Sequence, residues 1–312
     1  MVGILKGSLI GAETVDFEGA IELAAATGFD AFMVNNVYEI SHDLDEGAIR
    51  AGRQLALEKG VRLAAGLGGF NPLRHERCAL VAQAGNGDPV QGALKLAGVA
   101  ARCGLGELFF SVGMIPDRED PELTWAAQLE AVRAGLVAIA PALRDLGTRL
   151  LIKSHEEITT HEILWLIEAV GADVLGVAHD PVNVVCRIEE PVAATRRLAP
   201  YIRQIHIDDA SLHLDGQEVR RYLAPIGQGD LDWPAMLALV PEASRWVEIH
   251  RGQFAMACFD RDWMAQQPGV SVDEYCFVAG TAVRRGAEPA LCDQLAPYAR
   301  VPALRDWVSA QA

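Results

Sequence analysis

Carboxylate and imidazole side chains stand at the ends of apolar runs in this sequence. Asp180 follows one such run, His206 ends a second, and Glu248 lies within a third. An aspartate, a neutral imidazole and a glutamate together form a ligand set suited to Mn²⁺, Mg²⁺, Co²⁺ or Zn²⁺. An ion held in this way could bind two oxygens of a sugar and polarise its carbonyl while a base removes the adjacent C–H proton. These residue types therefore indicate a metal-dependent enzyme, provided that the fold brings them together.

A further group of polar residues follows the apolar run at 150–152 and includes Lys153 and His155. A lysine beside a divalent ion, or one removed from water, has a lowered pKa and can act as an acid or a base. Alternatively, its charge can hold a carboxylate or an enolate oxygen as that oxygen forms. We take Lys153 and Glu248 as the candidate acid/base groups. The candidate substrate contacts are His155, Asn183, Asp209, His250 and Arg251, and further site candidates from the first two strands are Lys6, Asn35 and Asn36.

Each of these residues also has a purely structural explanation. His206 could be a hydrogen-bonded histidine of a barrel wall, and Asp180, which precedes a proline, could shape a turn. Glu248 stands between apolar neighbours, where a carboxylate must be paired or bound to metal because burying it alone is costly. Its partner could then be Lys153 or Arg251. The occurrence of all these residues at the ends of successive strands favours the functional interpretation.

Eight expected strands alternate with helical segments along the chain. Apolar residues recur at helical spacing between the strands, as in 160–170, where a threonine precedes the helix and a glycine ends it. This alternation predicts a (β/α)₈ TIM barrel, whose active site lies at the carboxyl ends of the strands. We expect the barrel over residues 1–253, and the last barrel helix with a packed C-terminal helical extension over 254–312. The expected strands are 2–5, 31–34, 61–67, 108–112, 150–152, 174–178, 202–205 and 245–250.

Composition and charge restrict the classes of partner. The chain has 312 residues, 51% of them hydrophobic and 22% charged, which is typical of a globular protein with a large core. A net charge of −15 without a lysine or arginine cluster argues against nucleic acid and against anionic membranes as partners. The six cysteines form no C-x-x-C pair, and the N-terminus leads directly into a strand. We therefore expect reduced thiols and a cytoplasmic location.

Four segments carry a resemblance to a known family. They are Lys153–Thr159, the Leu175–Val177 strand with Asp180 and Asn183, the stretch from Pro191 to His206–Asp209, and Gly227–Trp233. Together they resemble the sugar phosphate isomerase/epimerase superfamily, the xylose-isomerase-like TIM barrel that also includes apurinic endonucleases. The resemblance covers about residues 1 to 253 and is strongest between 150 and 250. The net charge argues against an endonuclease, because binding DNA needs a surface that neutralises phosphates.

The resemblance implies one divalent ion shared by residues from four strands. In the family a glutamate on strand five, an aspartate after strand six, a histidine on strand seven and a glutamate on strand eight commonly hold it. Asp180, His206 and Glu248 match the last three positions. Lys153 stands at the strand-five position, and Asn183 stands where many members have a histidine. Because alternation points Lys153 and His155 the same way, His155 is our candidate for the fourth ligand.

The resulting functional prediction is a sugar isomerase/epimerase-like enzyme of carbohydrate metabolism that depends on a divalent metal, with Mn²⁺ as the first choice. It would act on a keto-sugar or polyol through a metal-stabilised enolate, and the resemblance implies a homo-oligomer. One alternative is a lyase or decarboxylase of an oxo-sugar acid or oxo-glycoside, because a lysine in place of a glutamate base suits one-sided chemistry. Another is a non-catalytic sugar-binding subunit, which the loss of that glutamate motivates.

Overall fold

Eight parallel strands close into a barrel in the computed structural model, which describes residues 1–250, 253–286 and 301–311. The order around the barrel is β1, β10, β7, β6, β5, β4, β3, β2. The predicted (β/α)₈ architecture is therefore confirmed, with C-terminal helices present. The barrel strands are β1 Val2–Leu5, β2 Ala31–Val34, β3 Arg62–Gly69, β4 Leu108–Ser111, β5 Leu150–Lys153, β6 Leu175–His179, β7 Ile202–Ile207 and β10 Ser244–Val247.

The chain forms two compact units. The first comprises Met1–Lys153 and Trp165–Ala178, and the second comprises Ser154–Leu164 and His179–Ala312. In the first unit, the strands from β1 to β6 pair in parallel, each with the next one along the chain. Most residues of these strands are buried, as expected of a parallel sheet that is covered on both faces.

Helices with polar N-terminal caps connect the strands of the first unit. Side chains of Asp16, Asp45, Asp88 and Thr124 accept hydrogen bonds from backbone N–H groups of the first turn of α1, α2, α4 and α6. The helix α3 lies between β3 and α4 in the chain. The helices are α1 Phe17–Ala26, α2 Glu46–Glu58, α3 His75–Ala84, α4 Pro89–Cys103, α5 Ile115–Arg118 and α6 Trp125–Asp145, and α7 Thr160–Val170 follows β5.

Close packing of α3 against α4 depends on a glycine. A Cβ atom at Gly92 would lie 1.8 Å from the carbonyl oxygen of Val81, so only glycine fits where the two helices meet. The neighbouring helix α6 is the one helix among the described residues that is long and apolar enough to cross a membrane, by length and composition only. It packs against α4 and buries Val132, Leu136 and Ile139, so it serves as a core helix of this unit.

The second unit adds an antiparallel sheet that the sequence analysis did not predict. The strands β8 Asp209–Asp215 and β9 Glu218–Ala224 form a hairpin through Gly216, which has a φ of 63°, and β11 Phe254–Met256 pairs with β9. The remaining elements of the unit are α8 Pro181–Val184, η3 Val185–Arg187, α9 Pro191–Leu198, α10 Trp233–Leu239, α11 Arg261–Met264, α12 Val272–Arg285 and α13 Val301–Ala310.

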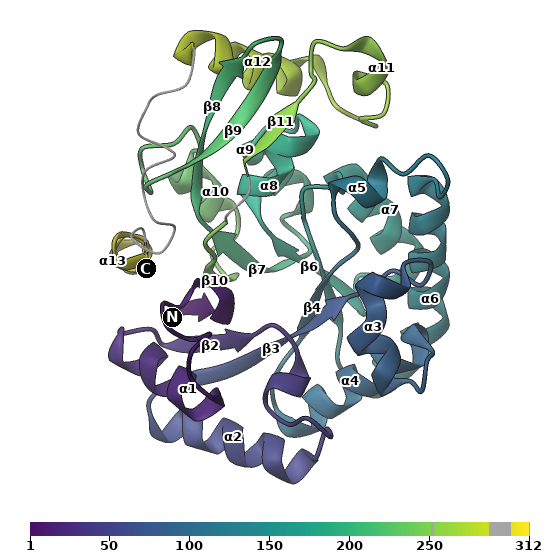
Figure 1. The fold of residues 1–312 in the computed structure, drawn as a ribbon, viewed down its shortest axis with the longest axis vertical. Helices are drawn as coiled ribbons and strands as arrows, with labels where there is room; N and C mark the ends of the chain where they lie inside the picture. Colours follow the sequence, from purple (N-terminus) through teal and green to yellow (C-terminus); the bar gives the residue numbers. More distant parts are fainter. Residues whose placement is uncertain (251–252, 287–300, 312) are drawn as a thin grey trace. The chain divides into compact units, whose positions relative to one another are not determined.

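The long helix α12 covers one face of this sheet (Figure 1). Leu212 of β8, Val219 of β9 and Met256 of β11 are fully buried in one cluster with Val278 and Ala282 of α12. The apolar residues of α12 thus complete a core that the sheet alone could not form. The hairpin and α12 therefore belong to one packed layer, and residues 287–300 of the expected C-terminal extension lie outside the described residues.

A buried ion network also anchors α12. Arg197 of α9 donates to Glu189 at 2.8 Å and to Glu274 of α12 at 2.7 Å. Glu189, which is fully buried, also accepts hydrogen bonds from Thr160. Burial raises the pKa of Glu189 to about 7 in spite of these hydrogen bonds and the arginine. One guanidinium thus joins the start of α7 to α9 and α12.

Candidate functional site

Three residues of the second unit form a compact cluster of possible metal ligands. Asp180, His206 and Glu248 each offer a ligand atom, and these atoms all lie within 4.8 Å of one another. Asp180 follows β6 as the residue before α8, His206 lies within β7, and Glu248 comes one residue after the end of β10. The three residues singled out from the sequence are therefore brought together by the ends of three barrel strands.

Strand register explains the contact between His206 and Glu248. Trp246 of β10 is aligned with His206 of β7, and the backbone N–H of Glu248 donates to the carbonyl of Ile207 at 3.2 Å. The Nδ1 atom of His206 lies 2.6 Å from Oε2 of Glu248, and its Nε2 atom lies 3.3 Å from Oε1 of Gln204. The imidazole is fully buried, whereas the Glu248 side chain is 19% exposed. Glu248 is thus the most exposed side chain of the cluster.

Asp180 is held by two donors on one carboxylate oxygen. Its Oδ2 atom accepts from Nδ2 of Asn183 at 3.0 Å and lies 2.8 Å from Nε2 of His250. The carboxylate and the asparagine are fully buried. Asn183, which we expected to contact substrate, therefore orients Asp180 in this structure.

His250 lies between two buried carboxylates. Besides Asp180, it contacts Asp208, whose Oδ2 atom is 3.2 Å from Nδ1 of His250 and accepts from the His250 backbone N–H at 2.9 Å. Burial by itself would lower the pKa of His250, but the charge of Asp180 and the hydrogen bonds to both carboxylates raise it to about 9. Two carboxylates this deeply buried require a compensating positive charge, which the imidazolium supplies here.

The structure places His155 in a different cluster from the one expected. Its Nε2 atom lies 2.7 Å from Glu156 and its Nδ1 atom 2.6 Å from Glu157, so both ring nitrogens contact carboxylates. These three residues form a second group of possible ligands, separate from that of Asp180. The prediction that His155 joins Asp180, His206 and Glu248 thus has no support in this geometry, because neighbouring glutamates hold its ring.

This second cluster leads to a prediction about pH. Burial would lower the pKa of His155, but the charges of Glu157 and Glu156 outweigh it and raise the pKa to about 10. The folded state therefore binds a proton more tightly than the unfolded chain, whose histidine pKa is about 6.5. This contribution to stability is fully present below about pH 6.5 and is lost as pH rises through the folded value.

We expect the free energy of unfolding to fall by a few kcal/mol between about pH 6.5 and pH 10, as measured by urea denaturation in the presence of a chelator. His155→Gln should make this fall smaller, because the variant lacks the imidazole that releases its proton over this pH range. His42→Gln replaces an exposed histidine and should leave the slope unchanged. An unaltered slope in His155→Gln would contradict the assignment.

Asp209 holds a loop in this structure. Its carboxylate accepts hydrogen bonds from the backbone N–H groups of Ala210, Gly227 and Gly229 at 2.8 to 3.1 Å. Burial raises its pKa to about 7 in spite of these donors. A Cβ atom at Gly229 would lie 2.1 Å from Oδ1 of Asp209, so the glycine is needed for the close approach. The close approach of the Asp209 carboxylate therefore explains why a glycine stands at position 229, in the segment after β9.

The remaining candidates lie elsewhere. Lys153 is the last residue of β5, is buried and belongs to the first unit, so its catalytic role stays a prediction. Lys6 forms a 2.5 Å ion pair with Glu39, which also accepts from the backbone N–H groups of Asn35 and Asn36. Lys6, Asn35 and Asn36 thus all contact Glu39 in the first unit. Arg251 lies outside the described residues.

Two residues at the site were missed from the sequence. Asp208 stands in the His-Ile-Asp-Asp segment, where its place after an apolar strand was a usable signal. Arg221 gave no comparable signal because it lies on β9, a strand that was not predicted. Its Nη1 atom donates to Oδ1 of Asn183 at 2.9 Å and to the carbonyl of Val182 at 3.1 Å. Both residues act on the groups that surround Asp180.

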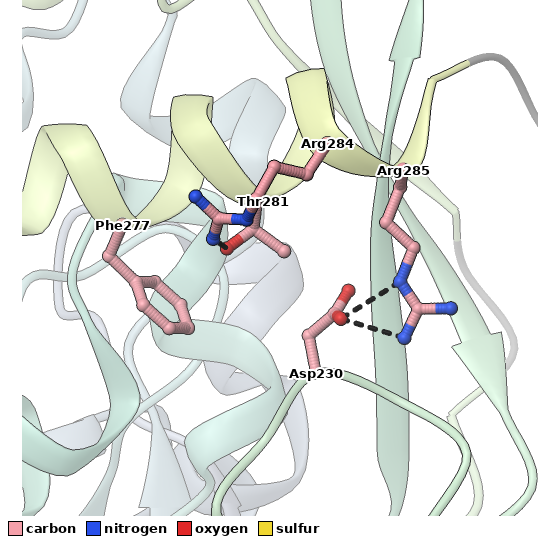
Figure 2. A pocket seen from close by; sticks show the side chains of 5 residues that line it. All are labelled: Asp230, Phe277, Thr281, Arg284 and Arg285. Carbon is pink, nitrogen blue, oxygen red and sulfur yellow. Dashed lines mark hydrogen bonds and ion pairs between the residues drawn. The ribbon is translucent and has the colours of Figure 1, made fainter.

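A separate pocket of about 410 Å³ in the second unit contains none of the predicted site residues. Figure 2 shows Arg285 directed at Asp230, to which it donates at 2.8 and 2.9 Å, and Arg284 bonded to Thr281 at 2.9 Å. The second oxygen of Asp230 accepts from the backbone N–H of Leu212 at 2.8 Å. These contacts attach α12 to the hairpin and the loop after it, so they have a clear structural role.

Comparisons with known proteins agree with the barrel fold. The family described as "Xylose isomerase-like TIM barrel" matches residues 21–249. The uncharacterized protein YihM of Escherichia coli strain K12 is 27% identical over 109 residues, which is 35% of this chain and 33% of YihM. The chain thus matches about a third of the length of this relative.

Two solved structures are similar over most of their length. D-psicose 3-epimerase with D-tagatose, from Clostridium cellulolyticum H10, has a TM-score of 0.61 and 14% identity, covering 89% of this chain and 98% of that one. The IolI protein with a binding zinc atom has a TM-score of 0.57 and 13% identity, covering 89% and 98%. At this identity the two likenesses show the fold. The family match spans more than half of the sequence, and the chain therefore belongs to the xylose isomerase-like TIM barrel family.

Proposed function

We propose that this protein is an enzyme that depends on a divalent metal and transfers protons at a carbon next to the carbonyl of a keto-sugar, as a sugar epimerase or isomerase does. The cluster of Asp180, His206 and Glu248 carries the proposal. It lies at the ends of barrel strands, where enzymes of this fold place their active sites. A related fold is that of an epimerase solved with D-tagatose.

The donor set of the cluster suits a divalent ion. Two carboxylates and an imidazole with ligand atoms inside 4.8 Å provide the hard and borderline donors of Mn²⁺, Co²⁺, Zn²⁺ and Mg²⁺. Asp180, His206 and Glu248 would hold the ion, and Gln204, which contacts the other nitrogen of His206, would orient the imidazole. When bound, the ion would polarise the substrate carbonyl and stabilise the negative charge that develops on its oxygen.

The residues around the cluster have separate tasks in this proposal. Glu248, which is partly exposed, takes the proton from the carbon next to the carbonyl and can return it to the neighbouring carbon on the same face. His250 lies between Asp208 and Asp180, with Nδ1 3.2 Å from one carboxylate and Nε2 2.8 Å from the other. When protonated, its imidazole would offset the charge of these two carboxylates.

Solvent deuterium exchange tests the proposal directly. Purified protein is stripped with a chelator, reloaded with Mn²⁺, Co²⁺, Zn²⁺ or Mg²⁺, and incubated in deuterium oxide with D-tagatose, D-psicose and related ketoses. Proton NMR then follows the loss of C–H signal next to the carbonyl and the appearance of an epimer or aldose. We expect exchange that depends on the metal. No exchange with any ketose, together with no metal binding, would contradict the proposal.

A further inference from the structure

We propose that Arg221 is a positioning residue for the metal site, which acts through Asn183 on the orientation of the Asp180 carboxylate. This inference deepens the proposed function and depends on it. Arg221 lies on β9, in the hairpin that the second unit adds to its barrel strands. Its side chain is fully buried, as are Asn183 and Asp180. The three residues therefore interact away from water.

The contacts run in one direction from the arginine to the aspartate. Nη1 of Arg221 donates to Oδ1 of Asn183 at 2.9 Å, and Nδ2 of Asn183 donates to Oδ2 of Asp180 at 3.0 Å. A guanidinium can only donate, and an ionised carboxylate can only accept. An amide is suited to connect them because it has an acceptor at one end and a donor at the other. Arg221 therefore decides which way the Asn183 amide points.

Two further contacts hold Arg221 itself in place. The same Nη1 atom donates to the carbonyl of Val182 at 3.1 Å, so the arginine contacts both the backbone and the side chain of α8. The guanidinium carbon also lies 4.7 Å from the centre of the Phe254 ring, and Phe254 is aligned with Arg221 in the pairing of β11 with β9. The antiparallel sheet thus holds the guanidinium in one position.

This arrangement has a consequence for the metal site. Partners that orient a metal ligand contribute to metal affinity, and their loss typically weakens binding about 10- to 100-fold. Without Arg221 the Asn183 amide could turn and present its oxygen to Asp180, which would repel the carboxylate. With Arg221 in place, Asn183 and His250 both donate to Oδ2, so the plane of the carboxylate is set. The hairpin thereby contributes to a site to which it supplies no ligand.

The test measures Mn²⁺ affinity by titration calorimetry on protein stripped of metal. Arg221→Met keeps the length of the side chain and removes the guanidinium, and we expect Mn²⁺ binding to weaken about 10- to 100-fold. Arg220→Met is the matched control, because Arg220 lies next to Arg221 on β9 but pairs with Asp215, whose side chain is 49% exposed. We expect its Mn²⁺ affinity to stay within about twofold of wild type, since the ion pair that it loses joins two residues of the hairpin.

A double substitution distinguishes positioning from a general loss of structure. Asn183→Leu removes the amide between Arg221 and Asp180, so adding Arg221→Met to it should weaken Mn²⁺ binding no further. Circular dichroism checks that each variant is folded. If Arg221→Met does not fold, Arg221→Lys keeps the buried charge and loses the planar guanidinium, and it should still bind Mn²⁺ more weakly than Arg220→Met does.

The outcomes separate this inference from the proposed function. Equal Mn²⁺ affinity in wild type and in the folded Arg221 variants, or fully additive losses in the double variant, would overturn the role of Arg221 and leave the proposed function intact. No binding of Mn²⁺, Co²⁺, Zn²⁺ or Mg²⁺ by the wild-type protein would overturn both. Weakened binding in Arg221→Met, unchanged binding in Arg220→Met and no added loss in the double variant would support the inference.

Discussion

Replacing His206 with alanine is expected to remove the bound divalent ion and to lower the rate of ketose exchange by at least about 10³-fold, because the several kcal/mol of charge stabilisation that a metal supplies is lost with it. His206 is fully buried, contacts Glu248 through Nδ1 at 2.6 Å, and is the imidazole of the cluster. Without the ion between them, the carboxylates of Asp180 and Glu248 would repel each other.

Elemental analysis of the purified variants measures this effect. We expect about one Mn, Co, Zn or Mg per chain in wild type, as a three-ligand site implies, and none in His206→Ala. His42→Ala removes an exposed histidine from the first unit and should keep its metal. Lys153→Ala should also keep its metal if the lysine acts on the substrate, so its activity then tests the catalytic prediction. Full metal occupancy in His206→Ala would show that the ion is held elsewhere.

Glu248→Gln is expected to have the second large effect. The substitution keeps the size of the side chain, but it removes the carboxylate that would accept the substrate proton. General base catalysis typically contributes about 10²- to 10⁴-fold, and we expect deuterium exchange to fall by that factor. The partial exposure of Glu248, beside the fully buried Asp180 and His206, is the reason for assigning it this step.

The exchange rate of this variant is measured at saturating Mn²⁺, with metal content determined on the same sample. This separates loss of the base from loss of the ion, because glutamine is also a weaker ligand than a carboxylate. Glu242→Gln, which alters an exposed glutamate ahead of β10, should exchange at the wild-type rate. Exchange within about threefold of wild type in metal-loaded Glu248→Gln would exclude Glu248 as the base, since a general base contributes far more.

The barrel was predictable because its strands carry the strongest local signal in the chain. Runs such as Ala31–Val34 and Leu150–Lys153 are buried throughout, as parallel strands covered on both faces must be, and the helices between them begin at polar caps. The predicted ends of the strands were less accurate. Glu248 lies just after β10, although the sequence placed it within a strand, because pairing with β7 stops at Val247.

The antiparallel sheet could not be recognised in the same way. The strand β8 begins at Asp209, two residues after β7 ends, in a segment whose polar residues were read as the end of a barrel strand. Its burial depends on α12, which lies about sixty residues further along the chain. Local propensity carries no information about such a distant partner.

The sequence by itself determined the architecture and three members of the proposed metal site. Asp180, His206 and Glu248 each end or follow an apolar strand, and parallel strands must bring their carboxyl ends to one edge of the barrel. Only the tertiary structure decided what surrounds them. It placed His155 between two glutamates, bound the Asp209 carboxylate to the backbone of the loop after β9, and brought Arg221 from the hairpin to Asn183. Contacts of this kind join residues far apart in the chain through side-chain packing, which residue spacing does not encode.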